Sequence, residues 1–145
     1  MGGIQLADDI FQLIRTVELF TNESIIRWTK AFKYNIGISP ILVLSELNQK
    51  GPQKQSELAN QLGYTPGAMT NIANRLIKDD YAARIYDEAD RRIIRLSITE
   101  AGKEILGEAQ QKGQELRKEL FSVLTEEERN QFLIIHEKLL KNFEK

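Results

Sequence analysis

The sequence contains no cysteine, three prolines and a single histidine among 145 residues. The absence of cysteine excludes disulfides, thiolate zinc sites and thiol switches that respond to oxidants. His136 alone cannot form a multi-histidine metal or catalytic site, so a structural or surface role is expected for it. A glycine-rich phosphate loop, a nucleophile elbow and an HExxH motif are also missing. These absences argue against an enzyme and predict that the protein uses no metal and no cofactor.

Long hydrophobic runs are absent as well. No apolar run reaches the ~18 residues that a membrane span needs, and the N-terminus has no charged region followed by a hydrophobic one. Hydrophobic residues make up 41% of the chain and charged residues 28%, values typical of a soluble protein. The length suits one domain over residues 1–145, which we expect to be cytoplasmic.

The chain also lacks a strong net charge of either sign, since its net charge is −1. Any binding to nucleic acid must therefore depend on local cations. Between residues 53 and 99 such cations include Lys54, Arg75, Arg84, Arg91, Arg92 and Arg95. With so few cations in one chain, tight binding to DNA would need two subunits and low to moderate salt.

The most informative stretch of the sequence is residues 54–102, which begins with two short helical patterns. The first is expected at Ser56–Leu62, with Ser56 as N-cap, and Gly63 suits the left-handed residue that ends a helix. The second has Thr65 as N-cap and Pro66 at the first helical position. Apolar residues then recur at intervals of three and four, at Met69, Ile72, Ala73 and Leu76.

The opposite face of this second helix carries small or neutral residues and one cation. It comprises Gly67, Ala68, Thr70, Asn71, Asn74 and Arg75. Small residues allow a helix to approach closely, and threonine, asparagine and arginine can bond base edges in a major groove. The pattern indicates a DNA recognition helix. The alternative is a surface helix of unusual composition.

A hairpin with a charged tip follows, with strands expected at Tyr81–Tyr86 and Ile93–Ile98. Arg91 and Arg92 at the tip suit a wing that enters an adjacent minor groove. Asp90 would repel phosphate if it were free, so we expect it to orient a neighbouring guanidinium, that of Arg92 or Arg84. A solvated turn is the alternative.

Helical patterns flank this region on both sides. One is expected from Leu6 to about Phe32, after a frayed segment at residues 1–5. Another begins at an expected N-cap, Ser39, and runs to about Gln49.

Two further helices follow the hairpin. A helix capped by Thr99 is expected to run to about Val123, with weak points at Gly107 and Gly113 where a bend could occur. Thr125 and Glu128 form a capping box that opens the last helix. The first and the C-terminal helices have too much apolar surface for a small monomer, which favours a dimer interface.

The stretch resembles the MarR family of transcription regulators. In that family a Gly-Pro segment and a Gln-Ser-Glu-Leu-Ala helix precede the recognition helix, and this chain has Gly51-Pro52 and residues 55–59 reading QSELA. The family's wing signature, Asp-x-Arg followed by alternating apolar residues and Leu-Thr-x-x-Gly, matches residues 90–102, with Ile98 in place of leucine. One departure is Asp80, where the family often has glycine; aspartate tolerates a left-handed turn, so the fold should survive.

The resemblance implies a mainly α fold with a small β-hairpin wing. A winged helix-turn-helix at residues 36–99 would be flanked by dimerisation helices at residues 5–35 and 100–145. The implied function is a homodimeric regulator, expected to be a repressor, that binds a pseudo-palindromic operator in double-stranded DNA. The candidate DNA-binding residues are Lys54, Thr65, Gly67, Ala68, Thr70, Asn71, Asn74, Arg75, Arg84, Asp90, Arg91 and Arg92.

Members of the family often bind small aromatic or anionic effectors between the dimer helices and the winged part. Trp28 and Phe32 are candidates to line such a pocket here, although core packing is the commoner role for aromatic residues four apart. The near-neutral charge keeps an alternative function open, a winged-helix protein-interaction module that does not bind DNA.

Overall fold

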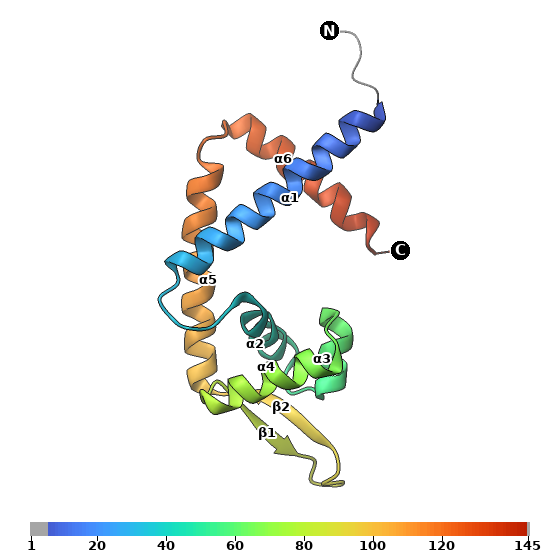
Figure 1. Ribbon diagram of the computed structural model, residues 1–145, viewed down its shortest axis with the longest axis vertical. Helices are drawn as coiled ribbons and strands as arrows, with labels where there is room; N and C mark the ends of the chain where they lie inside the picture. Colours follow the sequence, from blue (N-terminus) through green and yellow to red (C-terminus); the bar gives the residue numbers. More distant parts are fainter. Residues whose placement is uncertain (1–5, 145) are drawn as a thin grey trace.

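The computed structural model describes residues 6–144 and contains helices and a single hairpin in the described part (Figure 1). The elements are α1 (Leu6–Ala31), α2 (Ile38–Lys50), α3 (Gln55–Leu62), α4 (Pro66–Lys78), β1 (Ala82–Tyr86), β2 (Ile94–Ile98), α5 (Glu100–Phe121) and α6 (Glu126–Asn142). The predicted fold, mainly α with a hairpin wing, is confirmed. The expectation of a frayed segment at residues 1–5 lies outside the described residues.

Three helices and the hairpin form a compact winged end, and α5 leads from it to the other end, where α1 and α6 overlap in this view (Figure 1). The core lies almost entirely in the winged end and along the first half of α5. Its fully buried large side chains are Val43, Leu44, Leu47, Leu58, Met69, Leu76, Leu96 and Leu106. Each helix of the winged end therefore contributes the apolar stripe that its periodicity predicts.

The wing is an antiparallel pair whose register runs from Ala82 opposite Ile98 to Tyr86 opposite Ile94. On its other side, β2 is held by the loop before α3: Gln53 N donates to Leu96 O (3.1 Å), and Leu96 N donates to Gln53 O (2.7 Å). Strand β2 thus lies between two partners, and β1 is the free edge. This pairing fixes the base of the wing against α2 and α3.

The junction between α4, the wing and α5 depends on a very close approach. Asp80 adopts φ 64°, as the sequence predicts for a residue in place of glycine. Thr99 caps α5 by accepting from Gly102 N (3.0 Å), and its hydroxyl donates to Asp80 O (2.6 Å). A Cβ on Gly102 would overlap Tyr81 O and lie 2.8 Å from Ile98 Cγ1, so this position requires glycine. Helix α5 continues without a break through Gly107 and Gly113.

Two predicted N-caps are wrong. Helix α2 begins at Ile38 with Gly37 as its N-cap, so Ser39 lies inside the first turn. Helix α3 begins at Gln55 with Lys54 as its N-cap, so Ser56 is its second residue, and neither helix has a side-chain cap. In both cases the residue two positions before the serine has the extended backbone of an N-cap, so each helix begins two residues earlier than predicted. The caps Thr65, Thr99 and Thr125 are confirmed.

Helices α1 and α6 leave most of their apolar side chains uncovered in one chain. Helix α6 contains no buried residue, and Ile134 and Leu140 are 64% and 63% exposed. On α1, Phe11 and Leu19 are 64% and 62% exposed. Within residues 6–144, no helix combines the length and apolar character needed to cross a membrane.

Candidate nucleic-acid interface

Helix α4 displays the face predicted for a recognition helix. Thr65 Oγ1 accepts from Ala68 N (3.1 Å), Pro66 occupies the first turn, and the apolar face is held in the core by Met69, Ala73 and Leu76. The predicted contact residues on the opposite face are exposed to solvent: Gly67, Ala68, Thr70, Asn71, Asn74 and Arg75. Their exposure leaves the face free to meet a partner.

Several polar groups on this face are already engaged. The Thr70 hydroxyl donates to Pro66 O (2.9 Å), and Gln55 Nε2 lies 3.5 Å from the same hydroxyl. Arg84 of β1 donates through a terminal guanidinium nitrogen to Asn74 Oδ1 (2.9 Å). The bond between Arg84 and Asn74 joins the wing to α4.

Arg75 points away from the centre of the face. Its guanidinium donates to Asn35 O (2.6 Å) in the loop between α1 and α2, and lies 3.5 Å from the Asp79 carboxylate. Next to Asn35, a hydrogen bond with Glu108 of α5 raises the pKa of the Tyr34 phenol. This corner thus connects the C-terminal part of α4 to the loop and to α5. Lys54, at the N-cap of α3, is partly buried.

The tip of the wing is ordered by ion pairs. Asp90 accepts from Arg92 through both carboxylate oxygens, Oδ1 to Nε and Oδ2 to a terminal nitrogen, each at 3.0 Å. The prediction that Asp90 orients a guanidinium is confirmed, and the partner is Arg92. Hydrogen bonds from Arg92 lower the pKa of Asp90, and the Asp90 carboxylate raises the pKa of Arg92. The Arg92 side chain stays 91% exposed and projects from the tip.

Two further contacts support the tip. Asp87 accepts from Ala89 N (2.9 Å) and from Arg95 (3.3 Å), and these bonds, with the backbone bond first, lower the pKa of Asp87. The Arg91 guanidinium lies 5.4 Å from the centre of the Tyr86 ring, a cation–π contact. Arg91 and Arg92 are therefore both held in place at the tip while remaining exposed to solvent.

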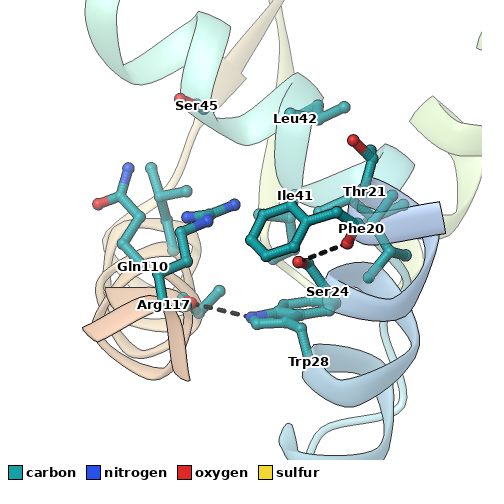
Figure 2. A pocket seen from close by; sticks show the side chains of 14 residues that line it. Phe20, Thr21, Ser24, Trp28, Ile41, Leu42, Ser45, Gln110 and Arg117 are labelled. Atoms are coloured by element: carbon teal, nitrogen blue, oxygen red, sulfur yellow. Dashed lines mark hydrogen bonds between the residues drawn. The ribbon is translucent and has the colours of Figure 1, made fainter. Parts of the chain in front are cut away.

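A cavity of about 470 Å³ lies between α1, α2 and α5 (Figure 2). Trp28 lines it, with its indole N–H donating to Ala109 O (3.1 Å), and Phe20 and Ile41 add further apolar surface. Figure 2 shows the polar ends of Gln110 and Arg117, both on α5, beside this space. The cavity therefore combines an apolar wall with polar groups, one of them cationic.

Phe32, the other predicted pocket residue, does not line this cavity. It is buried and stacks on Trp28 at a ring-centre distance of 4.8 Å. It borders a separate, shallower depression that also includes Tyr34 and Glu108.

Comparison with known proteins identifies the family. The sequence profile of the MarR family matches residues 38–94. The chain is 35% identical over 105 residues to the HTH-type transcriptional repressor MdtR of Bacillus subtilis, which covers 71% of this chain and 68% of that protein. The chain belongs to the MarR family. It is a MarR-family transcriptional regulator with a DNA-binding winged helix.

Solved structures share the fold of this chain. The YusO protein from Bacillus subtilis superposes with a TM-score of 0.75 at 28% identity, covering 94% of this chain and 96% of that one. A MarR family protein from Bacillus stearothermophilus gives a TM-score of 0.85 at 20% identity, covering 98% of this chain and all of that one, which shows that the fold is shared.

Sequence reasoning missed several parts of the site in this MarR-family regulator. Gln55 reaches Thr70 only because α3 packs across α4. The cavity residues Gln110 and Arg117 are far from Trp28 in the sequence and come together through the packing of α5 on α1. The one sequence signal available for them was the spacing of 110, 113 and 117, which places these residues along one side of α5.

Proposed function

We propose that the protein is a cytoplasmic homodimeric repressor that binds a pseudo-palindromic operator and is released by a small aromatic or anionic effector. The observation that carries the proposal is the division of the chain into two ends. One end presents a capped helix with a small, neutral, exposed face beside an arginine-tipped wing. The other end presents uncovered apolar helices.

The uncovered apolar side chains of α1 and α6 support the homodimer. A contiguous apolar surface on a single chain is typical of a protein–protein interface. The exposed apolar residues at this end are Ile10, Phe11, Leu13, Ile14, Val17, Leu19, Leu133, Ile134, Ile135, Leu139, Leu140 and Phe143. A second copy of the chain would cover these residues and place two winged ends on the same side of the assembly.

On DNA, each α4 would enter a major groove, and the two grooves would lie about one helical turn, roughly 34–36 Å, apart. Gly67 and Ala68 would allow close approach, Thr70 and Asn71 would face base edges, and Asn74 would hold Arg84 toward the backbone. Arg91 and Arg92 would reach a flanking minor groove, with Asp90 orienting Arg92. Lys54 would contact phosphate. Arg75 would contribute through its bonds to the loop before α2, and would reach DNA only after leaving them.

The cavity beside Trp28 supports effector control. Its apolar wall suits an aromatic ring, and Arg117 suits an anionic group. Because the cavity is bounded by α1, α2 and α5, a ligand inside it would favour one spacing between the winged end and the dimer helices. Release follows if that spacing prevents both α4 helices from reaching their grooves together, since avidity is then lost.

The proposal is tested by selecting duplexes from a random library with the purified full chain and measuring binding at two salt concentrations. The expected result is an inverted repeat with half-sites about one turn apart, bound much more weakly at the higher salt. Failure to enrich any sequence with folded protein would contradict the proposal and favour a protein-interaction module. The near-neutral net charge of −1 is the observation that supports this second candidate.

A further inference from the structure

The exposed stripe of α4 has one polar side chain at its centre whose hydrogen-bonding groups are all free. The stripe consists of positions three and four apart, which share one face of the helix: Gly67, Thr70, Asn71 and Asn74. The Thr70 hydroxyl donates to Pro66 O, and the Asn74 carbonyl oxygen accepts from Arg84. Among the described residues, Asn71 makes no side-chain hydrogen bond, and its amide is exposed.

The chemistry of a free asparagine amide at this position is specific. The amide presents one acceptor oxygen and an NH2 donor side by side. In the major groove, adenine presents the complementary pair, the N6 amino donor and the N7 acceptor, and asparagine bonds both. Asn74 is less available for this pairing because its oxygen already accepts from Arg84, and the Gln55 amide donates toward Thr70.

We infer that Asn71 is the specificity-determining residue of this regulator and that it recognises an adenine in each half-site of the operator. The inference rests on the proposed DNA-binding function. Asn71 lies in the second turn of α4, and the N-terminal part of a recognition helix is the part that contacts base edges. Gly67, one turn earlier, adds no side chain that would hold this part of the helix away from the groove.

The test uses the operator recovered by selection with the full chain. Each adenine in turn is replaced by 7-deazaadenine, which removes the N7 acceptor and keeps the Watson–Crick pair. We expect one adenine per half-site at which the replacement weakens wild-type binding about 5- to 150-fold. The Asn71→Ala variant should bind the natural operator more weakly than the wild type does. Its affinity should not change further when that adenine is replaced by 7-deazaadenine. Selection with this variant should lose the preference for adenine there.

Asn48→Ala is the matched control, because Asn48 is an exposed asparagine on α2, outside the α4 stripe. It should keep the sensitivity to 7-deazaadenine. The Asn71→Ala variant is expected to fold, because position 71 is exposed and alanine has the highest helix propensity. The inference is overturned if the Asn71→Ala variant selects the same operator as the wild type, or if no adenine is sensitive, while sequence-specific binding remains. If no operator is enriched, the proposed function and this inference fail together.

Discussion

In the winged end, Leu44 and Leu58 are completely buried, whereas at the other end Ile134 and Leu140 of α6 remain 64% and 63% exposed. Both regions have the apolar periodicity of packed helices. In the winged end these apolar faces are buried within one chain, because α2, α3, α4, the hairpin and α5 enclose a common core. Helix α6 adds no buried residue to this core, and α1 adds only its C-terminal part, through Trp28. The winged end therefore buries its apolar faces within one chain, whereas most apolar side chains of α1 and α6 stay exposed, which is the basis for the proposed homodimer.

The largest effect is expected from a charge placed on the uncovered end. Leu140→Glu should dissociate the homodimer and weaken operator binding about 10²- to 10⁴-fold, because each winged end would then bind alone. Sedimentation and operator titration measure the two effects. Gln114→Glu adds the same charge at an exposed polar position of α5 and should change neither. A dimer that survives Leu140→Glu would place the interface elsewhere.

The second effect concerns Leu58, one of the buried leucines of the winged end. Leu58→Ala should lower the free energy of unfolding by about 2–5 kcal/mol, because it leaves a cavity in a closed core. Denaturant titration measures this loss. Leu133→Ala on α6 truncates an equivalent side chain that is 56% exposed in one chain. Leu133→Ala should therefore change the free energy of unfolding of the winged end much less. An equal loss for both substitutions would show that the two ends do not unfold independently.

The third effect concerns the wing. Arg92→Ala should weaken operator binding about 10- to 100-fold, the loss of a charge-assisted contact, and leave the dimer intact. Lys118→Ala removes one exposed positive charge from α5 and serves as the control. Affinity measured at matched salt distinguishes them. Equal affinities for the Arg92→Ala variant and the wild type would remove the wing from the proposed mechanism.

The smallest effect is the response of the wing tip to acid. Because the pKa of Asp90 is lowered in the folded protein, its pairing with Arg92 is fully present above the ordinary carboxyl pKa of ~3.9 and is lost as the pH falls through the lowered value. The NMR signal of the Arg92 Nε–H should therefore stay constant from pH 7 to about pH 4. A change centred near pH 5 or 6 would show that the Asp90–Arg92 pair does not form in solution.

Local chemistry made much of the winged end predictable from the sequence. Thr65 with Pro66, the left-handed Gly63 (φ 74°) and the left-handed Asp80 each depend on neighbouring residues, and the structure contains all three. Ser39 and Ser56 show the limit of such signals. Each could have been an N-cap, but Gly37 and Lys54, two residues earlier, occupy the N-cap positions in the structure.

Long-range contacts could not be predicted in the same way. The bond from Arg75 to Asn35 O joins positions that are 40 residues apart, and the bond from Trp28 to Ala109 O joins positions that are 81 apart. The sequence indicated that Arg75 lies on the exposed face of α4, but not that its guanidinium turns back toward the loop before α2. The cavity beside Trp28 has the same origin, since three helices contribute its walls.

The proposed division of labour between the two ends is tested most directly by native mass spectrometry of the complex between the full chain and its selected operator. We expect two chains of 16.7 kDa on each duplex, and a dimer of two chains without DNA. A single chain bound to each operator, or a free protein that is monomeric at micromolar concentration, would contradict the division of the molecule into a DNA-binding end and a dimerising end.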